Sequence, residues 1–331
     1  MNRMPLQRRA LAKMLLPLVL LPLSMSLIQP AGAGPLRDKL KERRAERQAA
    51  QMEDDGGLAG EGRGAPATVP PGVNVVQDVA YGSGSAQRFD VYMPQAGARS
   101  APVIFMVHGG GWKRGDKNMK SVVENKAARW VPQGFVFISV NYPMLPDANP
   151  LQQAHAVAQA LAAAQLKASS WGGDPARFIV MGHSAGAHLV SLIASSPQIV
   201  AAERVQPWLG TIALDSAAYD VEEVMQHRHF KLYDEAFGTD QALWRDASPL
   251  AQLNAAGAPF LAVCSSRRRE SCPQAHGYVR KATRLGTRAQ VLEQDKSHKE
   301  INEDLGAPGA YTEAVEDFMR RLDPVVRGLL R

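Results

Sequence analysis

Short apolar stretches alternate with helix-like stretches from residue 73 onward, and this alternation constrains the fold more than any other feature of the sequence. Val103–Val107 is a continuous apolar run, which is typical of a strand buried on both faces of a parallel sheet. The other strand-like segments are Asn74–Ala80, Gln87–Met93, Phe135–Val140, Phe178–Met181, Thr211–Leu214, Phe260–Val263 and Gln290–Leu292. The helix-like segments are Asn118–Trp130, Pro150–Ser169, Ala187–Ser195, Pro273–Leu285 and Tyr311–Leu322. This order predicts an α/β fold with a mostly parallel central sheet of about eight strands and helices on both faces.

Small and polar residues follow the predicted strands at the point where each strand ends. Ligands of open parallel sheets bind at the carboxyl ends of the strands, so these residues are expected to share one edge of the sheet. In chain order they are His108–Trp112, Asn141-Tyr142, Gly182–Gly186, Asp215, Cys264–Cys272 and Glu293–His298. This edge is therefore where we expect the chemistry of the protein to take place.

The pentapeptide GHSAG, Gly182–Gly186, joins a predicted strand to a predicted helix. The pattern G-x-S-x-G at such a junction is typical of a nucleophile elbow, whose sharp turn excludes bulk two residues before and two residues after the serine. The turn presents the serine oxygen at the amino terminus of a helix, where the dipole favours the anion that forms on attack. We therefore predict that Ser184 is a nucleophile.

The run His108–Gly111 follows another predicted strand and contains three consecutive glycines. Glycine lets the backbone turn its N–H groups toward a ligand without obstruction by Cβ, as an oxyanion hole requires. A phosphate-binding loop is the alternative, but the sequence has neither the P-loop pattern nor a dinucleotide-binding glycine pattern with a downstream acid. The predicted oxyanion donors are the N–H groups of Gly110, Gly111 and Ala185.

A nucleophilic serine needs a base, and the sequence contains eight histidines. His298 is the histidine that directly follows the last strand-like run, so we predict that it is the base. His108 is expected to shape the glycine loop, and His188 to be a hydrogen-bonded packing residue. His227 and His229 have the i, i+2 spacing of a metal pair, but no further ligand joins them at suitable spacing, so we interpret them as surface or lid residues.

Three runs carry a resemblance to a known superfamily: HGGGWKRGDK (108–117), WGGDPARFIVMGHSAG (171–186) and GHSAGAHL (182–189). They resemble the α/β-hydrolase superfamily, and within it the esterase/lipase branch that combines an HGGG loop with G-x-S-x-G. Within this branch they look like the feruloyl-esterase/acetyl-esterase-like and kynurenine-formamidase-like members. The resemblance covers about residues 73–322 and implies the α/β-hydrolase fold. It also implies a serine hydrolase that uses Ser184, His298, Gly110, Gly111 and Ala185 in the roles given above.

The sequence departs from this family at two places. Pro143 and His155 stand where related enzymes often have an arginine and an acid, so contacts made by those residues are not carried over. The loop after the seventh strand usually offers an aspartate, whereas Cys264–Cys272 reads CSSRRRESC. We expect Glu270 in this loop to supply the acid that orients the histidine, with Asp215 and Asp295 as alternatives.

The loop Cys264–Cys272 also contains the only two cysteines of the chain. Two cysteines do not complete a zinc site, and one disulfide is the simplest interpretation in an exported protein. The arginines at positions 267, 268 and 269 either favour an anionic substrate or, as is more common for such runs, form a solvated loop. No metal and no organic cofactor are implied.

The amino-terminal residues differ in composition from the rest. Basic residues, an apolar run containing two prolines, and Ala31-Gly32-Ala33 follow one another as in a cleavable signal peptide, which predicts cleavage after Ala33 and a periplasmic or secreted protein. Residues 34–72 are charged and then rich in proline and glycine, which predicts a disordered arm and linker. The catalytic domain is predicted to span 73–331, with no stable membrane span after cleavage.

These features together predict an exported serine hydrolase that cleaves a small-molecule carboxylic ester through an acyl-serine intermediate. The alternatives are amide or formamide cleavage by the same residues, and an inactive hydrolase fold that only binds its ligand. Trp112 and Tyr142 at the predicted edge are candidate pocket residues. The net charge of +6 does not indicate nucleic-acid binding, because no nucleic-acid-binding motif accompanies it.

Overall fold

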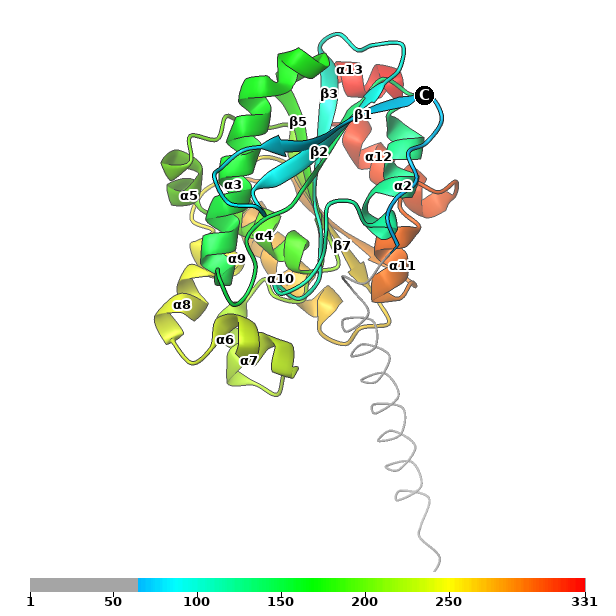
Figure 1. Cartoon of the computed structure of the whole chain (residues 1–331). Coiled ribbons are helices and arrows are strands. Elements are labelled where there is room, and N and C mark those ends of the chain that lie inside the picture. The colour runs from blue at the N-terminus through cyan, green and yellow to red at the C-terminus, as the bar shows by residue number, and fades with distance from the viewer. Residues whose placement is uncertain (1–64, 331) are drawn as a thin grey trace, which may run out of the picture. The chain divides into compact units, whose positions relative to one another are not determined.

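Eight strands form one sheet in the computed structural model, which describes residues 65–330 (Figure 1). The strands are β1 (Val73–Ala80), β2 (Arg88–Pro94), β3 (Ala101–Val107), β4 (Val136–Val140), β5 (Gly173–His183), β6 (Gly210–Leu214), β7 (Phe260–Ser265) and β8 (Ala289–Gln294). They pair in the order β1-β2-β4-β3-β5-β6-β7-β8, with β1 and β2 antiparallel to their neighbours and the others parallel. The predicted α/β fold with a mostly parallel sheet is confirmed, and β1 and β2 add an antiparallel edge to it.

Alternate residues of each central strand enter different cores, as the two-residue period of a strand requires. On one face, Phe105 and Val107 of β3 pack with residues of α3 (Pro150–Lys167) and α4 (Ala185–Ser195). On the other face, Ile104 and Met106 pack with α2 (Lys120–Trp130), α12 (Ala310–Arg320) and α13 (Pro324–Leu329). A third cluster packs α10 (Ser271–Arg284) against β7. Helices therefore cover both faces, as predicted.

Four short helices between β6 and β7 were not predicted from the sequence. They are α6 (Val221–Gln226), α7 (Lys231–Phe237), α8 (Gln241–Asp246) and α9 (Pro249–Gln252), and Figure 1 shows α6, α7 and α8 grouped together at the lower left. Each has seven residues or fewer, which is too short to display a helical period in the sequence. Side-chain caps at Asp220, Asp240 and Ser248 mark the starts of α6, α8 and α9, whereas α7 has no side-chain cap. The remaining short helices are α5 (Pro197–Ala202), α11 (His298–Glu303) and the 3-10 helix η1 (Ala168–Trp171).

The folded part begins before residue 73. The N–H of Ala67 donates to the carbonyl of Asn118 at 2.7 Å, and the N–H of Lys120 donates to the carbonyl of Ala65 at 2.8 Å. The last residues of the predicted 34–72 linker therefore pair with the chain just before α2. The predicted signal peptide and residues 34–64 lie outside the described residues. Across residues 65–330, no helix combines the length and the apolar character needed to cross a bilayer.

Candidate active site

Ser184 lies on a turn between β5 and α4 that requires glycine on both sides. The serine has φ 55° and ψ −120°, a conformation that residues other than glycine rarely adopt. A Cβ atom on Gly182 would lie 2.4 Å from the carbonyl oxygen of Gly186, and one on Gly186 would lie 2.3 Å from that of Val107. Side chains at these two positions would clash with backbone, so the sequence pattern and the sharp turn depend on each other.

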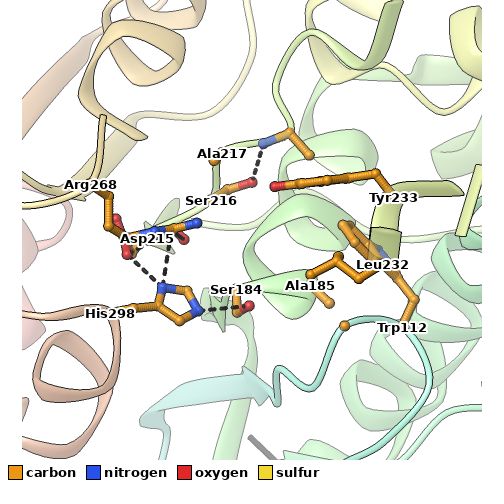
Figure 2. Close-up of a pocket in the computed structure, with 12 residues that line it drawn as sticks. Trp112, Ser184, Ala185, Asp215, Ser216, Ala217, Leu232, Tyr233, Arg268 and His298 are labelled. Carbon is orange, nitrogen blue, oxygen red and sulfur yellow. Dashed lines mark hydrogen bonds and ion pairs between the residues drawn. The ribbon is translucent and has the colours of Figure 1, made fainter. Parts of the chain in front are cut away.

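His298 contacts the serine from the first position of α11. A capping box fixes this helix start, because Ser297 Oγ accepts from the N–H of Glu300 and the Glu300 carboxylate accepts from the N–H of Ser297. His298 Nε2 lies 3.0 Å from Ser184 Oγ. A dashed line in Figure 2 marks this contact. His183 Nε2 donates to the carbonyl oxygen of His298 at 3.0 Å, a contact that nothing in the sequence indicated. The structure thus brings the predicted nucleophile and the predicted base into hydrogen-bonding distance.

The carboxylate that contacts His298 belongs to Asp215, and the expectation for Glu270 is corrected. Asp215 Oδ2 accepts from His298 Nδ1 at 2.5 Å, and the aspartate is fully buried. Glu270 stands at the start of α10, where its carboxylate is 49% exposed and faces Arg269 at 3.6 Å. Because Glu270 begins α10 on the solvent side of the loop, its side chain does not reach the histidine. Asp295, the other alternative, pairs with Arg267 at the surface.

Pairing of the strands sets the positions of the nucleophile and the acid. The N–H of Ser184, at the end of β5, donates to the carbonyl of Leu214 in β6 at 2.9 Å. The N–H of Asp215, directly after β6, donates to the carbonyl of Val263 in β7 at 2.8 Å. A backbone hydrogen bond thus connects Ser184 to β6 and Asp215 to β7. The carboxyl ends of three adjacent strands therefore form a rigid support for the site.

Three groups from one loop hold the Asp215 carboxylate in addition to His298. Oδ1 accepts from the N–H of Ser265 at 2.7 Å and from the hydroxyl of Ser271, and Oδ2 accepts from Arg268 Nη1 at 2.9 Å. Burial alone would raise the pKa of Asp215, but the Arg268 charge and the bonds from His298 and Ser271 outweigh it and hold the pKa well below its usual range. The aspartate is therefore ionised at neutral pH. Arg268 is buried here, so the interpretation of the three arginines as a solvated loop fails at this residue.

A disulfide closes the loop that carries these three groups. Cys264 and Cys272 are bonded, with their Cα atoms 5.1 Å apart, which confirms the predicted pairing. Ser265, Arg268 and Ser271 all lie between the two cysteines in the sequence. The ring thus restricts the positions of all three donors to the carboxylate.

The glycine loop and the start of α4 form the wall of a hollow beside Ser184. Gly111 and Ala185 line this hollow, consistent with their predicted place near an oxyanion. Gly110 is not among the described residues that line the hollow. Its carbonyl oxygen accepts from the N–H groups of Lys113 and Arg114 in a tight turn. Gly110 has φ 118°, and a Cβ there would lie 2.1 Å from the carbonyl oxygen of Arg114. Gly110 is therefore required for the loop's shape.

Trp112 lines the hollow, whereas Tyr142 does not. Trp112 packs edge-on against Phe237 of α7 at 5.0 Å between ring centroids, and Leu232 and Tyr233 of the same helix complete that wall (Figure 2). Tyr142 is fully buried beneath the loop, where its ring stacks on His108 and its hydroxyl donates to the carbonyl of His108 at 2.9 Å. The expectation that Tyr142 is a pocket residue is therefore corrected, because it supports the glycine loop from behind.

His188 connects Trp112 to the short helices and is a packing residue, as expected. Its Nδ1 accepts from Trp112 Nε1 at 3.2 Å, so the proton is on Nε2, which donates to the carbonyl of Ala247 at 2.7 Å. Burial lowers the pKa of His188 to about 4, although the bond to Ala247 opposes this. His188 therefore stays neutral in the folded protein at neutral pH.

His227 and His229 lie at the surface beside α6 and α7. His229 Nε2 lies 3.0 Å from the carboxylate of Asp234, and its Nδ1 donates to the carbonyl of His227. Within residues 65–330, no group of three or more histidine, cysteine, aspartate or glutamate side chains is arranged to hold a metal ion. The two histidines thus lie next to the helix that forms the pocket wall, and in the described residues they have no metal-binding geometry.

The two candidate acids can be separated by substitution. We expect Asp215→Asn to lower turnover about 10³- to 10⁴-fold. The amide would favour the wrong tautomer of the imidazole, and it carries no charge to stabilise the imidazolium. Glu270→Gln is expected to stay within about twofold of the parent protein, since losing an exposed pair has little effect. Steady-state kinetics on a chromogenic ester would measure both. A large loss in Glu270→Gln with a small loss in Asp215→Asn would contradict the geometry.

The neutral state of His188 makes stability depend on pH. Its folded pKa of about 4 lies below the unfolded value of about 6.5, so the unfolded chain binds the extra proton first as pH falls. Stability should therefore decrease between pH 6.5 and pH 4, by about 3 kcal/mol from this residue. His188→Gln can keep both hydrogen bonds without titrating, so its unfolding free energy should fall less over this range in urea titrations. Parallel pH dependences of the two proteins would argue against this.

Comparisons with known proteins agree with the fold and the elbow. Residues 89–269, more than half of the chain and including Ser184 and Asp215, match the BD-FAE family model. Esterase LipQ of Mycobacterium tuberculosis is 26% identical over 200 residues, which cover 56% of this chain and 47% of that protein. Kynurenine formamidase of Danio rerio is 26% identical over 150 residues, which cover 45% and 48%. The chain thus matches about half the length of these relatives.

Solved structures show the same architecture. Esterase B from Lactobacillus Rhamnosis superposes with a TM-score of 0.63 at 18% identity, covering 88% of this chain and 96% of that chain. A truncated carbohydrate esterase from gut microbiota superposes with a TM-score of 0.64 at 14% identity, covering 77% and 98%. At this level of identity the likeness establishes the α/β-hydrolase fold. The family match, together with the sequence similarity to curated esterases, shows that the chain belongs to the BD-FAE family in the esterase branch of the α/β-hydrolases.

Proposed function

We propose that this protein hydrolyses carboxylic esters through an acyl-serine intermediate. The observation that carries the proposal is the continuous contact from Ser184 Oγ to His298 Nε2 and from His298 Nδ1 to Asp215 Oδ2. A serine hydroxyl alone is a weak nucleophile, and a neighbouring base oriented by a carboxylate activates it. The similarity to Esterase LipQ also supports ester hydrolysis.

In the acylation step, His298 Nε2 takes the Ser184 proton while the serine oxygen attacks the ester carbonyl. The Asp215 carboxylate holds the Nδ1 proton in place and stabilises the imidazolium. The tetrahedral oxyanion forms next to Gly111 and Ala185, which line the hollow beside the serine. When this intermediate collapses, His298 returns the proton to the departing alcohol, and the acyl group stays on Ser184.

In the deacylation step, water takes the place of the alcohol. His298 removes a proton from the water as it attacks the acyl-serine carbonyl, and then returns the proton to Ser184 Oγ. The products are a carboxylic acid and the free serine. Each step needs a neutral His298 at its start, so activity should fall when that ring becomes protonated.

The pocket favours short acyl groups. The cavity beside Ser184 is small, about 10 Å³, and Trp112, Leu232 and Tyr233 form its apolar wall. Ligand pockets that enclose drug-sized molecules span about 300–1,000 Å³, so this cavity is far smaller than such pockets. We infer that short acyl groups such as acetyl are accommodated most easily, and that longer chains must displace α7 or remain in solvent.

Export is part of the proposal. The signal-like sequence of residues 1–33 predicts it, and the bond between Cys264 and Cys272 supports an oxidising compartment such as the periplasm or the cell exterior. The ring closed by this bond holds Asp215, so the site itself benefits from such a compartment.

The nucleophile can be tested directly. We expect a fluorophosphonate probe to label the protein at Ser184, and Ser184→Ala to abolish both labelling and ester hydrolysis. The loss in turnover should be on the order of 10⁶-fold, because the triad residues act as a unit. Thermal unfolding of Ser184→Ala should match the parent closely, since glycines set the turn. Labelling at another residue, or hydrolysis that survives the substitution, would rule out the mechanism.

Acyl-chain preference tests the pocket. For p-nitrophenyl acetate, butyrate and octanoate, kcat/KM should fall at least about tenfold from butyrate to octanoate, because the longer chain does not fit. Leu232→Ala should raise the rate on octanoate relative to butyrate, because the smaller side chain widens the pocket. Leu166→Ala is the matched control, since Leu166 is 86% exposed on α3. An unchanged profile in Leu232→Ala would show that α7 does not limit the acyl group.

A further inference from the structure

We propose that Arg268 is a positioning residue of this site that keeps His298 neutral, and the site therefore active, to lower pH than the aspartate alone would allow. This inference rests on the proposed function for its effect on turnover. Its effect on the protonation of His298 depends only on the structure.

The geometry places the guanidinium against both partners of the catalytic pair. Arg268 Nη1 lies 2.9 Å from Asp215 Oδ2, 3.2 Å from the carbonyl oxygen of Asp215 and 3.1 Å from His298 Nδ1. His298 Nδ1 carries a proton when Nε2 accepts from Ser184, so the guanidinium and Nδ1 are two donors to Asp215 Oδ2. Figure 2 shows Arg268 beside Asp215 on the side of the ring away from Ser184.

A fixed positive charge at this distance opposes a second proton on the imidazole. An aspartate alone would favour imidazolium and raise the pKa of the histidine. Here the Arg268 side chain is only 6% exposed, and its positive charge largely cancels the negative charge of Asp215. His298 therefore faces an ion pair with a net charge near zero. The low pKa of Asp215 reflects the same contact, because Arg268 is the strongest of the influences that lower it. Neutral imidazole is the form that accepts the serine proton.

Other titratable groups surround His298. His183 of β5 donates to its carbonyl oxygen, and the buried Tyr311 of α12 has a pKa raised well above its usual value by burial and by Asp215, so it is uncharged. Lys296 pairs with Asp304, and Glu300 with Arg267, at partly exposed positions. Arg267 also pairs with Asp295, so its cluster has one excess negative charge, but these side chains are exposed and screened by water. Arg268 and Asp215, in contrast, contact the ring in a buried setting.

The loop holds Arg268 in this position without relying on it for the position of the acid. Ser265 N–H and the Ser271 hydroxyl both bind Oδ1, while Arg268 binds Oδ2. Removal of the guanidinium therefore leaves two bonds from the disulfide ring and one from His298 to hold the carboxylate. The effect of removing the charge at residue 268 can thus be measured without displacing the Asp215 carboxylate.

The test measures the pKa of His298 in two independent ways. One is the acidic limb of the pH profile of kcat/KM on p-nitrophenyl acetate, and the other is NMR titration of the His298 ring in the resting protein. Arg268→Gln should move both upward by about one pH unit or more. Arg268→Lys, which keeps a charge, should stay within about half a unit of the parent. Arg269→Gln is the matched control, because Arg269 is 82% exposed and should shift neither.

The outcomes separate this inference from the proposed function. An unchanged NMR pKa in Arg268→Gln overturns the role of Arg268, and so does an equal shift in Arg268→Lys, which would indicate lost geometry and not lost charge. A shifted NMR pKa in a protein that hydrolyses no ester supports Arg268 and removes the proposed function. Arg268→Met, which has a long uncharged side chain, replaces the glutamine variant if circular dichroism shows that the latter does not fold.

Discussion

The buried carboxylate of Asp215 is the group on which the site depends. An ionised carboxylate without partners would be very unfavourable in this fully buried position, and the protein supplies four donors to it. Three of these donors come from one disulfide-closed ring, and the fourth is the base itself. Orientation of His298, and through it the activation of Ser184, follows from satisfying this one charge.

The elements that repeat a known physical pattern could be predicted from the sequence. The nucleophile elbow requires small residues around the serine, and Gly182 and Gly186 show that requirement directly in the sequence. The position of His298 after the last strand was visible because strand ends share one edge of a parallel sheet. The eight-stranded sheet followed from the alternation of apolar runs with helix-like segments.

The acid was misplaced because sequence position does not tell which way a side chain points. Glu270 and Asp215 both follow strands, but Glu270 begins a helix at the surface, whereas Asp215 has φ 57° directly after β6 and points toward His298. The burial of Arg268, which its sequence does not show, accounts for the acid: a buried arginine needs a buried anion, and Asp215 is the aspartate at the end of the adjacent strand. Tyr142 was misassigned for the same reason, since it follows β4 but turns beneath the glycine loop.

The acid follows a different strand from the one expected from the superfamily, and the loop after β7 has a different role. The acid is supplied one strand earlier, and the loop that would ordinarily carry it supplies Ser265, Arg268 and Ser271 as its donors. Because β6 lies between β5 and β7, an aspartate at its end is one strand closer to Ser184 than a residue after β7. A carboxylate so placed lies deep between strand ends, and it needs more donors than an acid on an exposed loop. The disulfide ring meets that need with three groups at fixed positions, so the change of acid position and the closed loop are physically linked.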